Sequence, residues 1–353
     1  MNFNVEVYGG SHERCVGVKI KGLPLGLKIN MDAIATMLTR RGASQSPWST
    51  PRMEKDEVNF TEGVTDGVVT GDEVVAEILN LNTKPHDYSN INTVPRPSHA
   101  DYVSYVKYGK IFSGGGKWSA RLTAPLCVAG AIAKEALKEQ GIEVGAYVSS
   151  IGSVQGKSYK SDNITLTEIE VCHKESLPTL TNAEAMVEEV VSAKKELDSV
   201  GGTIECIAYG LPVGLGDNLM DGMESAIAYM LYGIPGVKGV EFGAGFDISQ
   251  MRGSIANDAF VVEEGKVSTL TNHAGGINGG ITNGMPLTLR VAMRPTPSIA
   301  KEQDSVDLLT LQPTKLSVKG RHDSCIVPRA VAVVECAVAI SIYQKLVESQ
   351  SKD

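Results

Sequence analysis

Hydrophobic and polar residues alternate in the first part of the chain. Phe3, Val5 and Val7 are separated by polar or half-polar residues, and because side chains two residues apart share one face of a β-strand, this segment predicts a half-buried strand. The alternation from Val16 to Ile20 predicts a second strand. Since apolar residues occupy one face, we expect antiparallel sheets that are covered on one side. Further strands are predicted over residues 72–79, 144–154, 203–209, 237–243 and 286–293.

Five segments have the spacing of apolar residues that is typical of helices. The segment 124–140 is rich in small residues and apolar on most of its circumference before Gly141, so it is predicted to lie deep between other layers. The segment 328–348 starts with Pro328, which suits the first turn of a helix. The segment 182–197 has a charged face and is expected to be the most exposed. The predicted helices are 31–40, 124–140, 182–197, 220–232 and 328–348.

Two turns have nearly the same sequence. GLPLGL at residues 22–27 and GLPVGL at 210–215 each follow a predicted strand and precede a predicted helix. Two copies of one strand–turn–helix unit explain the match, and a favoured turn used twice is the alternative. Because no low-complexity linker divides the chain, we expect a single domain over residues 1–353, built from two related halves.

The overall charge restricts the partners. The 353 residues carry a formal net charge of −8, whereas proteins that bind nucleic acid or membrane surfaces depend on an excess of Lys and Arg. We therefore expect no nucleic-acid and no membrane partner, and an anionic ligand requires a local basic pocket. The pattern of a secretory signal is not found, so a cytoplasmic location is predicted. The cysteines and histidines lack the spacing of metal ligands, so no metal site is expected.

Histidines and glycines mark the candidate chemistry. His12, His99, His273 and His322 lie in glycine-rich or charged surroundings, where a histidine can transfer protons or bind an anion, although each alone is more often structural. The loop 113–117, Ser-Gly-Gly-Gly-Lys, leads into the helix predicted at 124–140, and free amides at a helix start suit a phosphate. The loop matches neither a P-loop nor a dinucleotide motif, and a tight turn is the alternative.

Basic residues gather near these segments although the protein is acidic. The arginine fork matches the oxygens of phosphate and carboxylate groups. The residues therefore point to a site for a small polyanion, with histidines available for proton transfer. The basic residues concerned are Arg40, Arg41, Arg52, Arg96, Lys107, Lys117, Arg121, Arg294, Lys319, Arg321 and Arg329.

Several of these segments occur together, in this order, in a known family. The matching blocks are Gly9 to His12, 96–109, 113–125, 233–246, 271–299 and 319–335, which read GGSH, RPSHADYVSYVKYG, SGGGKWSARLTAP, GIPGVKGVEFGAGF, TNHAGGINGGITNGMPLTLRVAMRPTPSI and KGRHDSCIVPRAVAVVE. Over nearly its full length the chain resembles chorismate synthase. The resemblance implies an α/β fold, a β-α-β sandwich with helices enclosed between antiparallel sheets and an internal pseudo-repeat. It also implies a homotetramer.

The resemblance further implies a lyase of the shikimate pathway. Its reaction is the anti-1,4-elimination of phosphate from 5-enolpyruvylshikimate 3-phosphate, which gives chorismate in the last common step. The reaction is redox-neutral overall but requires reduced FMN, which lends electron density as phosphate leaves. A substrate with one phosphate and two carboxylates fits a basic pocket in an acidic protein. Whether the chain reduces its own flavin with NADPH or depends on an external reductant stays open.

Individual residues correspond to functional residues of the family. His12 resembles the histidine that protonates the leaving phosphate, and His99 the one that protonates the reduced flavin. Ser11 and Ser119 correspond to serines that relay or orient these protons, and Asp323 to the carboxylate near flavin N5. The expected substrate-binding residues are Arg40, Arg41, Arg121 and Arg329. The expected FMN-binding residues are Lys117, Trp118, Ser119, Gly279, Arg294, Pro295, Thr296, Pro297, Ser298 and Arg321.

The sequence departs from the family pattern in its cations. Gly42 and Pro47 stand where the family has arginines, and Lys117 and Trp118 stand where Arg and Ser are typical. Two alternatives therefore remain open. One is a relative that binds flavin or an anion without catalysis, which the presence of both proton-handling histidines disfavours. The other is a flavin-dependent oxidoreductase, which none of the motifs supports.

Overall fold

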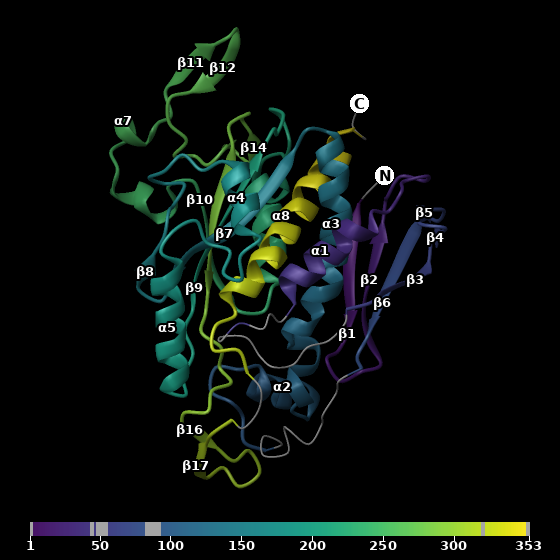
Figure 1. Cartoon of the computed structure of the whole chain (residues 1–353), viewed down its shortest axis with the longest axis vertical. Helices are drawn as coiled ribbons and strands as arrows, with labels where there is room; N and C mark the ends of the chain where they lie inside the picture. The colour runs from purple at the N-terminus through teal and green to yellow at the C-terminus, as the bar shows by residue number, and fades with distance from the viewer. Residues whose placement is uncertain (1–2, 43–45, 47–55, 82–92, 319–321, 351–353) are drawn as a thin grey trace.

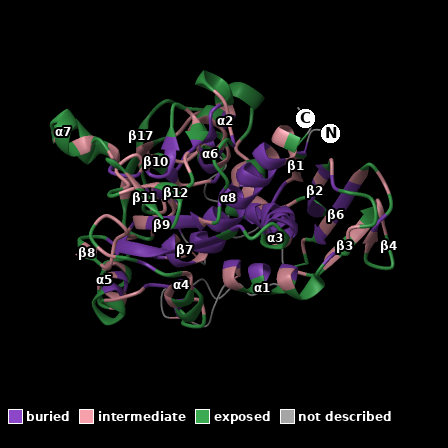
Figure 2. Cartoon of the chain, turned by 90° about the horizontal axis from the view of Figure 1, so that it is seen from above, coloured by how far each residue is buried: buried purple, intermediate pink, exposed green. Residues whose placement is uncertain are grey.

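Two antiparallel sheets form the outer layers of the molecule, and long helices lie between them (Figures 1 and 2). The structure, a computed structural model, describes residues 3–42, 46, 56–81, 93–318 and 322–350. In Figure 2 the buried helices at the centre separate the sheet of β1, β2, β3 and β6 from the sheet of β7 and β9. This arrangement confirms the predicted α/β fold with antiparallel sheets.

The first sheet has the strand order β1-β2-β6-β3, and all of its pairs are antiparallel. Val16, Val18 and Ile20 are buried against the helices, as their alternation predicts. The central strand β6 is buried over most of its length, whereas the edge strand β3 keeps alternate residues exposed. The bounds are β1 (Asn4–Gly9), β2 (Cys15–Lys21), β3 (Val58–Glu62) and β6 (Glu73–Leu79).

The second sheet has the order β10-β15-β9-β7-β8, again antiparallel throughout. Its central strands are buried on both faces, because the long helices cover one face and α4 and the segment around Tyr159 cover the other. The bounds are β7 (Glu143–Ile151), β8 (Val154–Gln155), β9 (Gly202–Tyr209), β10 (Val237–Phe242) and β15 (Leu287–Met293).

All five predicted helices are present, and three further ones were missed. α3 is buried over most of its circumference, as predicted, and α5 buries only Met186 and Val190. The apolar spacing did not indicate α2, α4 and α7, because α2 and α4 span about two turns and α7 about one; in α4 the capping box of Thr165 and Glu168 was a usable signal. The bounds are α1 (Met31–Arg41), α2 (Asp101–Tyr108), α3 (Thr123–Glu139), α4 (Leu166–Cys172), α5 (Ala183–Lys195), α6 (Met223–Tyr232), α7 (Gly253–Ala256) and α8 (Val327–Gln350).

The core centres on the contact between α3 and α8. At the crossing, the two backbones approach closely because Gly130 has no side chain: a Cβ atom there would lie 2.1 Å from the Cβ atom of Cys336 and 2.6 Å from its Cα atom. Real Cβ atoms do not approach so closely. Cys127 and Cys336 are among the six cysteines, all of them free and buried, so the helices are joined by packing and not by a disulfide.

Glu335 of α8 bonds to residues of three neighbouring elements. Its side chain is fully buried and accepts hydrogen bonds from both Arg40 Nη atoms, at 3.0 and 2.8 Å, from Lys134 Nζ and from the backbone N–H of Ala146 at 3.2 Å. Burial opposes ionisation, but the charges of Lys134 and Arg40 outweigh it and hold the pKa of Glu335 well below its usual range. One carboxylate therefore links α8 to α1, α3 and β7.

α8 is long and apolar enough to cross a membrane by length and composition alone. However, 89% of its most apolar 18-residue window is buried inside the protein. A helix that is apolar on all sides and covered on all sides is the expected form of a core helix.

The two similar turns adopt the same backbone geometry. The first and fifth residues of each turn, Gly22 and Gly26 in one and Gly210 and Gly214 in the other, all have positive φ angles. Gly26 N–H donates to the carbonyl of Val69, in the hairpin β4–β5, at 2.9 Å, and Gly214 N–H donates to the carbonyl of Thr282, in the hairpin β13–β14, at 3.0 Å. This likeness supports the proposal that one domain contains two related halves.

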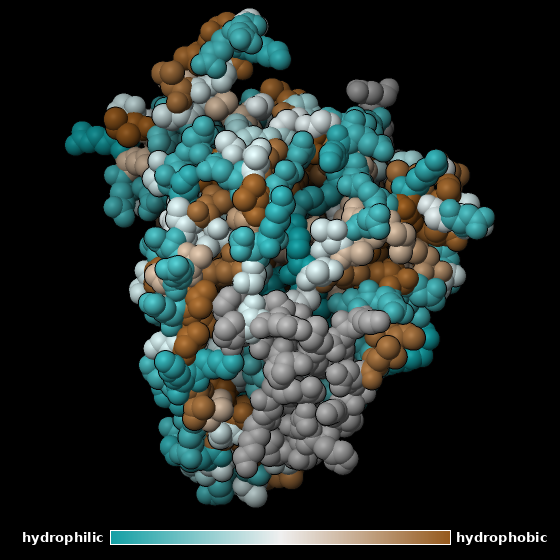
Figure 3. Space-filling view, viewed as in Figure 1, coloured by the Kyte–Doolittle hydropathy of each residue, from teal (hydrophilic) through white to brown (hydrophobic). Residues whose placement is uncertain are grey.

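Several short strands and 3₁₀ helices lie outside the two main sheets. The hairpin β11–β12 stands away from the body of the molecule (Figures 1 and 3), and its apolar residues Phe260, Val262 and Val267 are exposed. The short strands are β4 (Val64–Thr65), β5 (Val68–Val69), β11 (Phe260–Glu263), β12 (Lys266–Thr269), β13 (Ile277–Asn278), β14 (Ile281–Thr282), β16 (Gln303–Val306) and β17 (Pro313–Leu316), and the 3₁₀ helices are η2 (Ser113–Trp118), η3 (Ala120–Leu122), η4 (Leu219–Asp221) and η5 (Gly245–Gln250).

Gly130→Ala tests the α3–α8 contact. The added methyl group meets Cys336 and must push the helices apart, so we expect the free energy of unfolding to fall by about 1–3 kcal/mol, the usual cost of overpacking a core. Gly253→Ala is the matched control, because Gly253 is also helical and no atom lies within 4 Å of the position that a Cβ would take; it should be neutral or stabilising. Urea unfolding of both variants measures the difference, and equal stability would contradict the proposed close contact.

Candidate functional site

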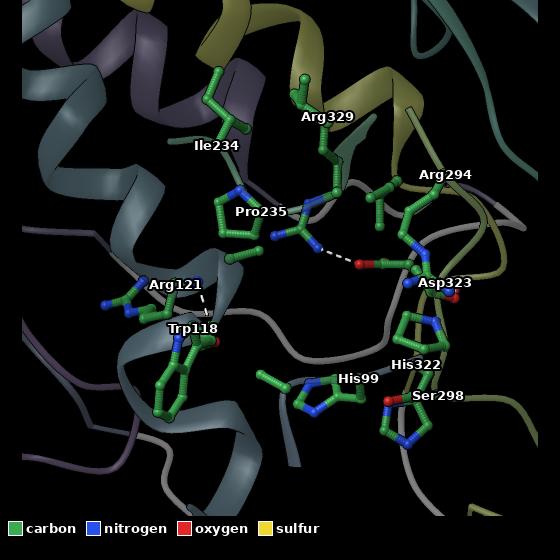
Figure 4. Close-up of a pocket in the computed structure, with 18 of the residues that line it drawn as sticks. His99, Trp118, Arg121, Ile234, Pro235, Arg294, Ser298, His322, Asp323 and Arg329 are labelled. Atoms are coloured by element: carbon green, nitrogen blue, oxygen red, sulfur yellow. Dashed lines mark hydrogen bonds and ion pairs between the residues drawn. The ribbon is translucent and has the colours of Figure 1, made fainter. Parts of the chain in front are cut away.

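A cavity of ≈ 630 Å³ lies where α1 and α6 end and α8 begins. This size is within the range of sites that enclose small organic ligands. In Figure 4, Trp118 and Arg121 lie on one side of it, Arg294 and Asp323 lie on the other, and His99 lies between them. The lining comes from segments far apart in the sequence, namely residues 41–42, 56, 96–100, 114–121, 232–238, 294–298 and 322–329.

Positive charge dominates the lining. Among the described lining residues seven are Arg or Lys and two are acidic, although the whole chain carries a net charge of −8. α3 and α8 also begin beside the cavity, and the start of a helix carries partial positive charge. The cationic residues are Arg41, Arg96, Lys117, Arg121, Lys238, Arg294 and Arg329; the acidic ones are Asp56 and Asp323.

Arg41 is one of the buried cations that line the cavity. Its Nε donates to Thr123 Oγ1 at 3.0 Å and its Nη2 to the carbonyl of Ala120 at 2.8 Å, at the start of α3. Burial and the nearby charge of Arg329 lower the pKa of Arg41 to about 10, with Asp56 opposing them. The site is thus short of negative charge, and an anion bound here would relieve the repulsion.

Two aspartates hold the arginines in place. Asp56 pairs with Arg41 at 3.4 Å and with Arg121, and Asp323 accepts from Arg329 Nη1 at 2.6 Å. Arg329 also donates to the backbone carbonyl of Arg41 at 3.1 Å. Each arginine therefore has a fixed orientation before any ligand binds, and the site requires little reorganisation.

A turn of three glycines separates His12 from His99. Gly114, Gly115 and Gly116 all have positive φ, a conformation that other residues rarely adopt. A Cβ atom at Gly114 would lie 2.1 Å from His12 Cε1, and one at Gly115 would lie 3.6 Å from His99 Nε2. The two imidazoles thus pack against successive residues of one backbone turn, and the close approach of His12 requires the glycine at position 114.

Ser11 ties His12 to the glycine turn. Its hydroxyl lies 3.0 Å from His12 Nδ1 and donates to the carbonyl of Gly114 at 3.2 Å, and its backbone N–H donates to the carbonyl of Gly116 at 3.2 Å. Ser11 is buried, and neither it nor His12 is part of the described cavity wall, which includes Gly114. The pair therefore lies directly behind the wall.

His99 belongs to a short, tightly bonded loop. Its Nδ1 lies 2.7 Å from Asp101 Oδ1, and Arg96 holds the same carboxylate through its Nε at 2.7 Å and its Nη2 at 2.8 Å. Arg96 Nη1 reaches Ser298 Oγ at 3.0 Å. This loop therefore joins the histidine to the segment 294–298 across the cavity.

The segment 294–298, which was predicted to bind FMN, forms one wall of the cavity. Arg294 Nη1 donates to the carbonyl of Ser98 at 2.6 Å, and Thr296 Oγ1 donates to the carbonyl of Asp323 at 3.0 Å. Trp118 stands on the opposite side of the cavity (Figure 4). The ammonium of Lys117, the preceding residue, lies 3.9 Å from the centre of the Tyr108 ring. Ser119 caps η3 by accepting from the N–H of Arg121 at 3.2 Å.

Most of the predicted site residues line this one cavity, but some do not. Arg40, expected to bind substrate, points away from it and is bonded to Glu335 and His173, because neighbouring residues of a helix point about 100° apart. Gly279, expected to bind FMN, lies in the β13–β14 turn outside the cavity wall. Arg321, like Pro47, lies outside the described residues.

The sequence analysis missed part of the site. Asp56 and Asp101 were not singled out, and Arg96 was noted only as one of many basic residues; the segment 232–238 was noticed for its resemblance alone. His322 lines the cavity, whereas His273 is held by its backbone N–H, which donates to Asp258. The spacing of Arg96, His99 and Asp101 within six residues was a signal that could have identified this cluster.

Comparison with known proteins agrees across the whole chain. The chorismate synthase family model matches residues 3–347. The chorismate synthase of Dehalococcoides mccartyi strain 195 is 41% identical over 342 residues, which cover 96% of this chain and 93% of that protein. The chorismate synthase of Thermococcus kodakarensis is 42% identical over 347 residues, covering 98% and 96%.

A solved chorismate synthase structure has the same fold. It superposes with a TM-score of 0.74 at 26% sequence identity and covers 99% of this chain and 93% of that chain. The match of family, relatives and fold over nearly the full length shows that the chain belongs to the chorismate synthase family of lyases.

Proposed function

We propose that this chain eliminates phosphate from 5-enolpyruvylshikimate 3-phosphate to give chorismate, with reduced FMN as cofactor. The observation that carries the proposal is the concentration of seven cationic side chains around one cavity of an acidic protein. A substrate with one phosphate and two carboxylates supplies the negative charge that this cavity lacks. Family membership supports the same reaction.

Arg41, Arg121 and Arg329 bind the anionic groups of the substrate. The three guanidinium groups lie around Asp56 and Asp323 and keep their orientations through these two carboxylates. Because an arginine fork donates hydrogen bonds to two oxygens of one phosphate or carboxylate, the cluster can hold a ligand in one orientation.

The proton-handling groups are His12, His99 and Asp323, with Ser11 and Ser119 orienting them. His12, bonded to Ser11 and packed against Gly114 of the cavity wall, is the acid that supplies a proton to the leaving phosphate. Asp323, in ion pair with Arg329, accepts the proton that the elimination removes from the substrate. His99 holds a proton for the flavin.

The lining of the cavity fits FMN in both of its parts. Ile234, Pro235 and Ile326 give an apolar surface suited to a flat ring system, and Lys117, Ser119, Arg294, Thr296 and Ser298 give hydrogen-bond donors suited to a phosphate chain. When bound, reduced FMN supplies electron density that assists departure of the phosphate. We place Gly279 and Arg321 among the FMN residues by resemblance alone.

We also propose a homotetramer in the cytoplasm. The exposed apolar side chains of the β11–β12 hairpin, together with Tyr229 and Phe246, which are 80% and 81% exposed, support an assembly that would cover them. The source of electrons for the flavin, NADPH or an external reductant, is a separate question for assay.

The reaction itself is tested by phosphate release. Incubated without oxygen with the substrate and dithionite-reduced FMN, the protein should release one phosphate for each chorismate formed, and none with oxidised FMN. A relative that only binds ligands would release no phosphate under either condition. A flavin-dependent oxidoreductase would consume reduced flavin in proportion to product, so the flavin absorbance distinguishes this second alternative.

Arg41→Lys and Arg40→Lys form a matched pair for substrate binding. Arg41→Lys keeps the charge but removes the fork, so the substrate KM should rise roughly 5- to 100-fold, equivalent to about 1–3 kcal/mol. Arg40→Lys should instead lower the free energy of unfolding, because Arg40 is bonded to Glu335. Steady-state kinetics with saturating reduced FMN and urea unfolding measure both effects. An increase in KM for Arg40→Lys alone would overturn the assignment of Arg41.

Gly114→Ala tests the contact between His12 and the glycine turn. The new Cβ would lie 2.1 Å from His12 Cε1, so the imidazole must move, and we expect turnover to fall by roughly 10- to 1,000-fold, the range for loss of a positioned general acid. Gly109→Ala has equal backbone strain, with φ of 72°, but no atom within 4 Å of its Cβ. It should leave kcat nearly unchanged; a similar loss in both would attribute the effect to backbone strain.

A further inference from the structure

Asp101 contacts His99 on the side away from the glycine turn, and none of the roles above uses it. We propose that Asp101 is a positioning residue that holds His99 in a single tautomer, with the proton on Nδ1 and with Nε2 directed to the glycine turn and the cavity. The proposal rests on the proposed function in one respect, because it assigns the proton-holding role of His99 to one atom. Its structural content can be tested separately.

The carboxylate of Asp101 is ionised. Asp101 is 2% exposed, and although burial opposes ionisation, the hydrogen bonds from Arg96 and His99 outweigh it and hold the pKa of Asp101 well below its usual range. An ionised carboxylate only accepts hydrogen bonds. In the 2.7 Å contact between His99 Nδ1 and Asp101 Oδ1, the imidazole nitrogen is therefore the donor.

Both carboxylate oxygens are saturated with donors. Oδ2 accepts from the backbone N–H of Arg96 at 3.0 Å and from its Nε at 2.7 Å, and Oδ1 accepts from Arg96 Nη2 at 2.8 Å as well as from His99. An asparagine at this position has an NH₂ group in place of one carboxylate oxygen, and this group cannot accept hydrogen bonds. With the NH₂ group at the Oδ1 position one bond from Arg96 is lost, whereas at the Oδ2 position two are lost. The Oδ1 position is therefore favoured, and there the NH₂ group faces His99 Nδ1.

The backbone of the loop is strained at the residue before the histidine. Ser98 has a φ of 58°, in the left-handed region that costs a serine conformational energy. Two bonds hold it there: Arg294 Nη1 donates to the Ser98 carbonyl at 2.6 Å, and the N–H of His99 donates to the Arg96 carbonyl at 3.2 Å. The strained turn and the Arg96–Asp101 ion pair therefore both fix the position of the His99 imidazole.

The fixed tautomer determines which atom exchanges the proton. In the neutral ring Nε2 carries a lone pair, and when the ring gains a proton it does so at Nε2, beside Gly115 at the cavity wall. In both forms of the ring Nδ1–H stays bonded to the Asp101 carboxylate, which itself stays unprotonated. Proton uptake and release therefore occur at one atom on the cavity side.

Asp101→Asn tests the proposal. The amide N–H at the Oδ1 position donates to His99 Nδ1, so the ring proton should move to Nε2. We expect the ¹⁵N chemical shifts of His99 Nδ1 and Nε2, recorded above the pH range of histidine titration and assigned with His99→Gln, to exchange their positions. We also expect kcat to fall roughly 100- to 10,000-fold, as for loss of a correctly protonated acid–base group, with KM within about 3-fold.

Asp258→Asn is the matched control. Asp258 also bonds a loop that contains a histidine, through Thr271 Oγ1 at 2.6 Å and the N–H groups of His273 and Ala274 at 2.8 and 2.9 Å, but it does not line the cavity. The His99 signals and kcat should be unchanged in this variant. Asp101→Glu keeps the charge and should retain the wild-type tautomer with an intermediate kcat.

Each result decides a separate point. A wild-type spectrum with Nδ1 unprotonated, or an Asp101→Asn variant that keeps the wild-type tautomer while losing activity, would overturn the positioning role; the wild-type spectrum decides if the variant does not fold. Failure of the wild-type protein to release phosphate would instead count against the proposed function, and the tautomer measurement would still stand.

Discussion

The close contact between α3 and α8 determines the positions of the other elements. Both sheets pack on this pair of helices, and the helices approach so closely because Gly130 leaves room for the backbone of Cys336. Glu335 precedes Cys336 and is buried by the same contact, so its charge must be matched by partners from the surrounding elements. Arg40 and Lys134 supply that match, which fixes the orientation of α1 against the core.

The position of α1 in turn determines the chemistry of the cavity. Its last residue, Arg41, reaches the start of α3, and Arg329 in the first turn of α8 bonds to the carbonyl of the same residue. Cations from three helix ends therefore converge, and their mutual repulsion opposes folding. Asp56 and Asp323 offset part of this cost. The remaining positive charge gives the cavity its preference for anions.

The sequence predicted the layers better than it predicted the contacts. Alternation along strands such as 286–293 and the apolar circumference of 124–140 directly reflect burial, so these elements were found. α2 and α4 are too short to show a helical period, and α2 leaves several apolar residues exposed.

Membership of the site depended on the direction in which each side chain points, and the sequence alone does not give that direction. Arg40 and Arg41 are adjacent and chemically identical, and only the rotation of α1 sends one to the core and the other to the cavity. Asp101 was not selected because its role depends on how Arg96 and His99 fold around it, and their close spacing in the sequence was the only signal of that arrangement. The resemblance to a family supplied the role of His12, and it alone supplied Asp323 and the residues 295–298, which composition and spacing could not have selected.

Because Arg40 and Arg41 are adjacent and have different partners, their positions depend on the number of residues that precede them in α1. Each residue added to a helix turns all later residues by about 100°. A one-residue insertion ahead of Arg40 would therefore place Arg40 at the cavity and Thr39 beside Glu335, whereas a one-residue deletion would place Arg41 beside Glu335 and Gly42 at the cavity. Either change leaves one of the two positions without a guanidinium group. The exposed residues of α1 can vary in kind at little cost, but the number of residues in the helix cannot vary. Gly42 ends the helix, so this constraint on the number of residues applies to α1 itself.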